Sequence, residues 1–339
     1  MKRLKIIIDA MGGDHAPQEI IKGALRARQE LGVELVLVGQ EEAVRACLPA
    51  PVPEGIEEVD AREVITMEDD PSTATRRKKD SSMAVALRLL HEGRGDAVVS
   101  AGSTGALLTG ATLTVKRIRG IRRAALAPVL PAGEHGVMLI DCGANVECTA
   151  EYLLQFACMG SFYAKKLMGI PNPRVGLLNV GTEDTKGGEL QHQAFDLLQK
   201  AHRERRIQFV GNIEGTDVFS GNVDVAVTDG FTGNVLLKAT EGVIKYMMHA
   251  LKDVFYKNTF NKLAAAVLKK DLAAMKKSLD VNEVGGTALI GISKPVVKAH
   301  GSSNEASFFA AIRQAKQFAE SGIIDDIVAN IDSMRLRGD

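Results

Sequence analysis

The sequence predicts an α/β fold in which a mostly parallel central sheet is flanked by helices. Short runs rich in β-branched residues alternate with longer segments of helical periodicity, an order typical of βαβ units. Most of these runs are continuously apolar, which indicates strands that are buried on both faces. The predicted strands are Leu4–Ile8, Leu35–Val38, Ala97–Ser100, Val137–Asp141, Val175–Val180, Gln208–Gly211 and Val223–Thr228.

Composition and charge narrow the class of protein. The chain has the make-up of a globular protein, and residues 1–339 are expected to form a single α/β unit, either compact or bilobed. Lys and Arg total 42, as do Asp and Glu, so the overall charge indicates no nucleic-acid partner. The four cysteines lack C-x-x-C spacing, and the first residues lack a secretory apolar segment, so we expect a cytoplasmic protein. No apolar run approaches the roughly 18 residues that cross a bilayer, so any membrane contact is expected to be peripheral.

Helix boundaries support the predicted order of elements. Pro17 suits the first turn of a helix that Gly32 ends. Asp80 and Ser81 suit the N-terminal cap of a helix over Met83–Leu90.

Residues 232–280 form a long segment without a convincing strand, and we expect a protruding helical hairpin there. Apolar residues recur at helical spacing on both sides of a turn at Asn258–Asn261. Such a hairpin suits packing or contact with a second copy of the chain. Alternatively its tip, where Phe260 and Leu263 lie among lysines, suits an apolar wedge at the surface of an anionic bilayer.

Polar loops that contain glycine follow most of the predicted strands. Because the carboxyl ends of parallel strands share one edge of a sheet, these loops are expected to meet along a single rim. The loop after the first strand is expected to be an anion cradle, since two glycines expose amides beside the N-terminus of a helix; Gly-Gly alone would indicate only a tight turn, but polar residues flank it here. Its candidate phosphate ligands are Asp9, Gly12, Gly13, Asp14 and His15. The dinucleotide fingerprint G-x-G-x-x-G is absent, which argues against a nicotinamide cofactor.

The later loops supply further candidates. Gly102, Ser103, Thr104 and Gly105 precede an apolar helix, where their amides and hydroxyls either bind phosphate or cap the helix. Asn145 is a further candidate ligand. The remaining polar candidates at loops are Lys186, Asn212, Asp229, Asn234, Lys298, His300, Ser302, Ser303 and Asn304.

Taken in order, these segments closely resemble the bacterial acyl carrier protein:phosphate acyltransferases of phospholipid synthesis. The resemblance spans nearly the whole chain, and its most specific motifs are IDAMGGDHAP at residues 8–17 and KAHGSSN at residues 298–304. Two positions depart from the family pattern: Ser103 stands where Asn is expected, and Thr287-Ala288 stands where Ala-Pro is expected. The first departure puts in doubt the ligand role of Ser103 and leaves the family assignment intact.

The resemblance implies a fold related to phosphotransacetylases and isocitrate-type dehydrogenases. It implies transfer of a long fatty acyl group from acyl carrier protein to inorganic phosphate, with acyl phosphate then passing to a membrane glycerol-phosphate acyltransferase. It also implies a homodimer and membrane association through the hairpin. No cofactor and no metal are expected.

That reaction assigns roles to the candidate residues. Lys186 or Lys298 would neutralise charge, and Asn145, Asn212 or Asn234 would donate to the oxyanion. His300 or His15 would handle the phosphate proton. Asp9 and Asp229 either orient loops or act directly. A covalent route through Cys142 is an alternative that we do not expect, since a free cysteine is commonly a small buried residue.

Partners remain open at the level of the sequence. Acyl carrier protein is acidic in this family, so two basic runs are candidate docking surfaces, with a solvated helix face as the ordinary alternative. The runs are residues 76–79, and Lys116, Arg117, Arg119, Arg122 and Arg123. Alternative functions are a phosphotransacetylase-like enzyme that uses acyl-coenzyme A and a non-catalytic phosphate- or acyl-binding protein at the membrane.

Overall fold

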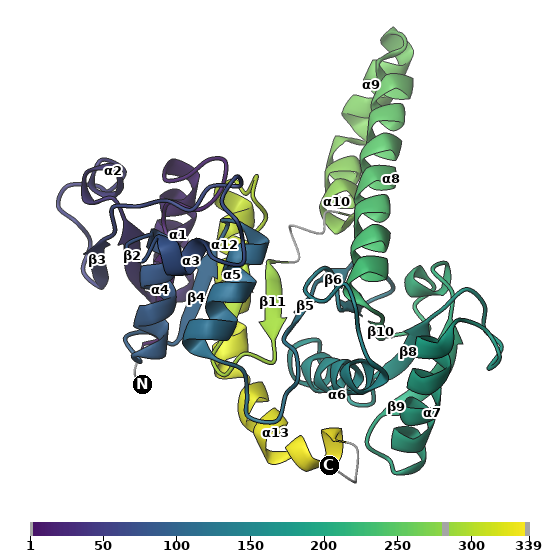
Figure 1. Ribbon diagram of the computed structural model, residues 1–339. Helices are drawn as coiled ribbons and strands as arrows, with labels where there is room; N and C mark the ends of the chain where they lie inside the picture. Colours follow the sequence, from purple (N-terminus) through teal and green to yellow (C-terminus); the bar gives the residue numbers. More distant parts are fainter. Residues whose placement is uncertain (1–2, 280–284, 336–339) are drawn as a thin grey trace.

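Two sheets organise the molecule, whose computed structural model describes residues 3–279 and 285–335 (Figure 1). The first sheet has seven strands in the order β3-β2-β1-β4-β12-β11-β5. Neighbouring strands are parallel except that β11 is antiparallel to both β12 and β5. The strands are β1 (Lys5–Asp9), β2 (Glu34–Gly39), β3 (Ile56–Asp60), β4 (Ala97–Ser100), β5 (Ala125–Ala127), β11 (Thr287–Ile290) and β12 (Val296–Lys298).

The second sheet has five strands in the order β6-β7-β10-β8-β9, and only the pairing of β6 with β7 is antiparallel. Its strands are β6 (Val129–Leu130), β7 (Val137–Ile140), β8 (Arg174–Leu178), β9 (Gln208–Ile213) and β10 (Val225–Val227). The seven predicted strands are all present, but three belong to the first sheet and four to the second. The expectation of one shared rim is therefore wrong, because the chain crosses between two sheets through the short strands β5 and β6.

Helices cover both sheets. They are α1 (Gln18–Leu31), α2 (Glu41–Arg45), α3 (Ala74–Arg77), α4 (Ser82–His91), α5 (Thr104–Gly110), α6 (Ala150–Leu167), α7 (Glu189–Arg203), α8 (Gly230–Tyr256), α9 (Thr259–Val267), α10 (Lys269–Leu279), α12 (Glu305–Glu320) and α13 (Ile323–Ala329). A π-helix at Ala111–Val115 extends α5, and 3₁₀ turns lie at Asp217–Phe219 and Ile331–Met334. The predicted boundaries hold: Ser81 Oγ accepts from the amide of Ala84 at 3.3 Å, and Gly32 ends α1 with φ of 66°.

The hydrophobic core forms two layers, one on each face of the sheets. Side chains alternate between the layers along β1, with Ile6 and Ile8 in one layer and Ile7 in the other. Each layer also contains residues of the second sheet, such as Ile140 in the first layer and Leu139 in the second. The shared layers explain the continuously apolar strands, since both faces are buried, and they fix the two lobes relative to each other.

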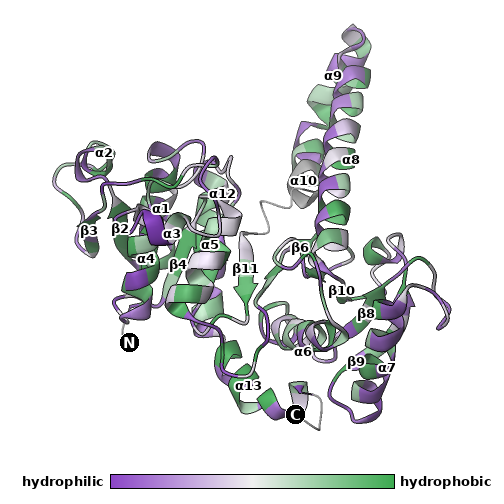
Figure 2. Ribbon diagram, in the orientation of Figure 1, coloured by the Kyte–Doolittle hydropathy of each residue, from purple (hydrophilic) through white to green (hydrophobic). Residues whose placement is uncertain are grey.

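The hairpin projects away from both lobes (Figure 1). Of the residues of α8, only Gly230 and Gly233 are buried, so this long helix is anchored at its base alone. Its return arm is two helices, α9 and α10, where the sequence predicted one, and no glycine or proline marks the break at Leu268. Apolar and polar residues are interspersed along the whole projection (Figure 2). Among the described residues, no helix is both long and apolar enough to span a bilayer.

Two glycines of α8 differ in the space that an added side chain would have, and this contrast gives a prediction. A Cβ at Gly233 would lie 2.0 Å from the carbonyl oxygen of Asp141, whereas a Cβ at Gly242 would meet no atom within 4 Å. Gly233→Ala is expected to lower the free energy of unfolding by about 3 kcal/mol, because backbone must move. Gly242→Ala is expected to raise it by up to about 1 kcal/mol, because alanine favours a helix. Urea unfolding followed by circular dichroism measures both, and equal effects at the two positions would contradict the anchoring of α8 at its base.

Candidate active site

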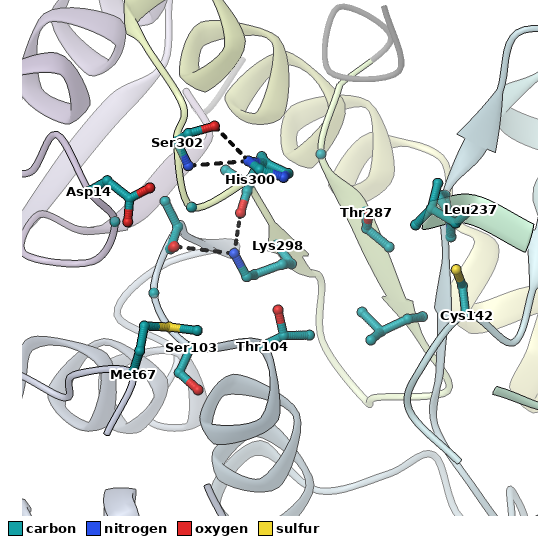
Figure 3. Close-up of a pocket in the computed structure, with 18 of the residues that line it drawn as sticks. Asp14, Met67, Ser103, Thr104, Cys142, Leu237, Thr287, Lys298, His300 and Ser302 are labelled. Carbon is teal, nitrogen blue, oxygen red and sulfur yellow. Dashed lines mark hydrogen bonds between the residues drawn. The ribbon is translucent and has the colours of Figure 1, made fainter. Parts of the chain in front are cut away.

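A cavity of about 520 Å³ lies between the carboxyl ends of β1, β4 and β12 and the base of α8 (Figure 3). Many of the predicted site residues line it, from both ends of the chain. They are Gly13, Asp14, Gly102, Ser103, Thr104, Asn234, Lys298, His300 and Ser302. The cavity brings these residues together between two lobes and not along the single rim that was expected.

Strand register brings the first group of residues together. In the parallel pairing of β1, β4 and β12, Ser100 is the partner of Asp9 on one side and of Lys298 on the other. The loops that follow these strands therefore start at the same level. The amide of Asp14 donates to the carbonyl of Gly301 at 2.8 Å, so the N-terminal glycine bend and the segment 298–304 lie side by side.

The glycine bend has no room for side chains. Gly13 has φ of 106°, and a Cβ there would lie 2.9 Å from the Cβ of Ala101. A Cβ at Gly12 would lie 2.6 Å from Oδ2 of Asp9 and 2.7 Å from the amide nitrogen of Gly102. These glycines let the two loops approach each other closely, and Gly13 itself lines the cavity.

Asp9 lies beneath the loops and outside the cavity lining, with only 1% of its surface exposed. Ser100 Oγ donates to its Oδ2 at 2.6 Å, and the amide of Gly102 in turn donates to Ser100 Oγ at 3.1 Å. Burial raises the pKa of Asp9, an effect that these hydrogen bonds and the charge of Lys298 oppose. The geometry favours the orienting role that the sequence left open for Asp9.

Lys298 supplies a buried positive charge at the crevice. Its residue surface is 8% exposed, and Nζ donates to the carbonyls of Ala101, at 3.2 Å, and of Ala299. Burial lowers its pKa to about 8, against the opposing charges of Asp9 and Asp14. The ammonium group is therefore charged at neutral pH but loses its proton far more easily than an exposed lysine does.

His300 faces the cavity in a defined tautomer. The amide of Ser302 donates to Nδ1 of His300 at 3.2 Å, and Ser302 Oγ lies 2.9 Å from the same atom (Figure 3). An amide only donates, so Nδ1 carries no proton and the neutral ring has its proton on Nε2. Partial burial lowers the pKa of His300, which keeps the ring neutral at physiological pH. The residue thus presents a hydrogen-bond donor.

The base of α8 forms the facing wall. Asn234, Leu237, Lys238 and Glu241 line the cavity at i, i+3, i+4 and i+7, which is one face of the helix. Lys238 Nζ and Glu241 Oε2 form an ion pair of 2.9 Å. Of these four residues, the sequence predicted only Asn234 as a site residue, because the rest of this segment has the pattern of the hairpin. Asn234, Lys238 and Glu241 recur at helical spacing after the Asp229 cap, and this pattern in the sequence could have predicted that they share one face of the helix.

Four predicted residues lie in the second lobe, outside the cavity lining, and have structural partners there. Lys186 pairs with Glu183 at 3.8 Å, and Asn212 Nδ2 donates to the Glu183 carbonyl at 2.9 Å. Asp229 caps α8 by accepting from the amide of Thr232 at 2.8 Å. Asn145 Nδ2 donates to the Ala124 carbonyl at 2.9 Å. These four side chains do not line the cavity, although the second lobe does contribute Cys142 and the base of α8 to it.

The remaining predicted residues lie beside the cavity without lining it. Asn304 Oδ1 accepts from the amide of Ser307 at 3.0 Å and so caps α12, while the carbonyl of His15 accepts from the amide of Glu19 at 3.1 Å. A Cβ at Gly105 would meet Pro71 at 2.7 Å, and Ser303 is buried. Asn304 thus has a structural partner, whereas the buried Oγ of Ser303 has no hydrogen-bond partner among the described residues.

Cys142 lines the cavity but is poorly suited to act as a nucleophile. Its thiol donates to the carbonyl of Gly233 at 3.4 Å. Burial, with a smaller contribution from Asp141, raises the pKa of Cys142 to about 12, so the thiolate is scarce at neutral pH.

The cations of the crevice are lysines. In residues 3–279 and 285–335, no group of three or more His, Cys, Asp or Glu side chains is arranged to hold a metal ion. Lys298 and Lys238 lie on opposite walls, each accompanied by carboxylates, and the glycine loops add the partial charges of their amides. The crevice therefore suits a small, doubly charged oxyanion.

Comparisons with a family of sequences and with individual relatives indicate the same family for this chain. Residues 4–326 match a family described as fatty acid synthesis protein. The chain is 48% identical over 331 residues to the phosphate acyltransferase of a Geobacillus species, covering 97% of this chain and 99% of that protein. It is 47% identical over 326 residues to the phosphate acyltransferase of Desulfitobacterium hafniense, covering 96% of each.

Solved structures with the same fold are more distant in sequence. A phosphotransacetylase from Streptococcus pyogenes aligns with a TM-score of 0.64 at 17% identity, over 95% of this chain and 94% of that one. A branched-chain phosphotransacylase from Enterococcus faecalis aligns with a TM-score of 0.56 at 15% identity, over 94% of this chain and 100% of that one. The predicted α/β class, related to phosphotransacetylases, is confirmed.

The lowered pKa of Lys298 gives a prediction on pH. Affinity for inorganic phosphate is expected to fall as pH rises through about 8, because the lysine then loses its charge in the free protein. Lys298→Met is expected to weaken binding at neutral pH by about 10- to 100-fold, through loss of a charged hydrogen bond. Isothermal titration with phosphate across this pH range measures both effects.

The matched control is Lys298→Arg, since arginine stays charged throughout the range. Its affinity is expected to show no decline near pH 8. A decline shared by wild type and Lys298→Arg would show that another group titrates.

Proposed function

The chain belongs to the family of phosphate acyltransferases, and from that premise we propose that it transfers a long-chain fatty acyl group from acyl carrier protein to inorganic phosphate. One observation carries the proposal for this chain: the glycine bend, the Ser103–Thr104 helix start and Lys298 meet in one cavity. Such a set of amides, hydroxyls and a buried cation suits a phosphate dianion.

The reaction needs no nucleophile from the protein. An oxygen of HPO₄²⁻ attacks the thioester carbonyl carbon, the C–S bond breaks, and the proton of the phosphate ends on the departing thiol. Charge and atoms balance, since the products are the acyl phosphate dianion and a neutral thiol. A thiol with a pKa near ~8.5 is a fair leaving group, so the enzyme acts chiefly by holding phosphate against the carbonyl and stabilising the oxyanion.

Residues on the two walls divide this work. Lys298, the amide of Gly13 and the hydroxyls of Ser103 and Thr104 bind phosphate. His300 presents Nε2–H, which suits donation to the oxyanion or to the leaving sulfur, after which the ring recovers the proton from phosphate. Asn234, on α8, is a further donor that lines the cavity. The high pKa of Cys142 favours this direct route over an acyl-cysteine intermediate.

The two candidate docking surfaces for the acidic carrier differ in their distance from the cavity, because they lie near opposite ends of the strands of the first sheet. The first run is close to the cavity: Lys78 Nζ donates to the carbonyl of Val64 at 2.9 Å, and residues 64–67 line the cavity. The second run lies beyond the far end of β11, where Ile121 and Arg123 contact Gly291, whereas Thr287 at the near end lines the cavity. We therefore assign carrier docking to the exposed Arg76, Arg77 and Lys79.

We further propose that the hairpin provides the dimer and membrane contacts. Tyr246 and Met247 on α8 are 75% and 62% exposed, which suits burial against a second copy of the chain. At the tip, Phe260 and Val267 are 84% and 83% exposed among lysines, which suits the surface of an anionic bilayer. This position also suits delivery of acyl phosphate to a membrane glycerol-phosphate acyltransferase.

The membrane contact is tested by replacing both apolar side chains of the tip with carboxylates. Phe260→Asp with Val267→Asp is expected to abolish co-sedimentation with anionic vesicles and to preserve the dimer in sedimentation velocity. Retained vesicle binding would refute the membrane role.

The donor and the docking surface are tested together. Purified protein with phosphate is expected to form acyl phosphate from long-chain acyl carrier protein at a higher kcat/KM than from the matching coenzyme A thioester. Replacing Arg76 and Arg77 by Glu is expected to lower kcat/KM for the carrier substrate by at least tenfold at low salt, through lost charge complementarity. The same variant is expected to keep its rate with the coenzyme A thioester.

The matched control reverses the same number of charges at the far end of the sheet, in Arg122→Glu with Arg123→Glu. It is expected to leave the carrier kinetics unchanged. Activity with coenzyme A thioesters alone would favour the phosphotransacetylase-like alternative, and the absence of phosphate-dependent thiol release from any donor would favour a non-catalytic binding protein.

A further inference from the structure

The crevice has two chemically different walls. Asp14 and Ser302 lie on one side, and Leu237 and Cys142 lie on the other (Figure 3). On that second side, α8 also contributes the polar Asn234, Lys238 and Glu241. We call the apolar part of this side the apolar wall. It consists of Leu126, Pro128, Val129, Cys142 and Leu237.

The cavity is too large for phosphate alone. Its volume is about 520 Å³, whereas an ion of five heavy atoms takes on the order of 100 Å³, a few times the share of one water molecule. We call the side of Asp14 and Ser302 the polar wall. Once phosphate is bound there, most of the cavity remains beside the apolar wall. That space is available to the second substrate.

Hydrogen bonds fix the apolar wall from behind. The buried carboxylate of Asp141 accepts from the amides of Leu126, at 2.9 Å, and of Cys142, at 2.7 Å. The amide of Cys142 donates to the carbonyl of Leu126 at 2.9 Å, and its thiol donates to the carbonyl of Gly233 at the base of α8. The β5 strand, the loop after β7 and α8 are thereby joined, so this surface is preformed.

An apolar wall of this kind serves no purpose for an oxyanion. An apolar surface offers a charged ligand no hydrogen bond in exchange for the water that the ligand loses. Of the side chains that α8 contributes to the cavity, Leu237 alone is apolar, between the polar Asn234 and Lys238. The apolar part of the substrates is the acyl chain.

We propose that the apolar wall is the subsite for the acyl methylenes next to the thioester carbonyl, and that Leu237 determines which chain lengths are accepted. This proposal rests on the proposed function. With phosphate on Lys298, the carbonyl carbon lies between the walls, and the chain runs from it along Leu126 and Cys142 toward the base of α8. Leu237 borders that path.

This subsite predicts a dependence of rate on chain length. Burying one methylene is worth about a fourfold change in an equilibrium constant, so kcat/KM is expected to rise about fourfold per methylene while the chain contacts the wall. The rise should flatten where the chain leaves the cavity. A subsite on an open surface would give a much shallower rise.

The test measures kcat/KM of the full-length protein with acyl thioesters of increasing chain length, for wild type and Leu237 variants. Leu237→Phe narrows the path, so the ratio of kcat/KM for long to short chains is expected to fall at least about tenfold. Leu237→Ala removes wall surface, so the rise per methylene is expected to become shallower. Leu237 is only partly buried, which favours folding of both variants, and circular dichroism checks it.

The matched control is Leu236→Ala, since Leu236 is equally apolar, precedes Leu237 on α8 and does not line the cavity. It is expected to keep the wild-type profile. Leu237 variants that change all chain lengths by one common factor, or that keep the wild-type profile, would overturn the subsite while wild-type acyl phosphate formation upholds the proposed function. A wild type that forms no acyl phosphate from any thioester would remove both.

Discussion

The site depends on the parallel register of β1, β4 and β12. This register aligns Asp9, Ser100 and Lys298 on three neighbouring strands, so one buried carboxylate, one hydroxyl and one buried ammonium lie at the same level. A shift of one residue in any of these strands would turn its end residue to the opposite face of the sheet. The glycine bend and the segment 298–304 follow from this alignment, because their loops leave the sheet together and are joined by the bond from Asp14 to Gly301.

Burying a charged lysine is energetically unfavourable, because the ammonium group loses its water, and neighbouring groups offset this loss at Lys298. Two backbone carbonyls accept from the ammonium group of Lys298, and two carboxylates lie near enough to oppose the lowering of its pKa. Burial in turn makes the charge effective, because an oxyanion that binds there meets little competing water. The same burial makes the charge sensitive to mildly alkaline pH.

The base of α8 links the crevice to the hairpin. Asp229 caps the helix, Gly233 packs against the carbonyl of Asp141, and the next turns face the cavity. One helix thus lines the site at one end and carries exposed aromatic residues at the other. The chemistry and the proposed surface contacts therefore share a rigid element, which places the crevice at a fixed distance from whatever the hairpin contacts.

The sequence by itself determined the α/β class, the seven principal strands, the cap at Ser81 and the family, because these follow from local periodicity, turn chemistry and specific motifs. It also identified many of the residues of the polar wall, since glycines and hydroxyls that follow parallel strands lie at the edge of the sheet where ligands bind. Only the tertiary structure divided the strands between two sheets, which removed Lys186 and Asn212 from the site and added Leu237, Lys238 and Glu241. The physical reason is that local pattern specifies a strand but not its partners, which are decided by packing between segments far apart in the chain.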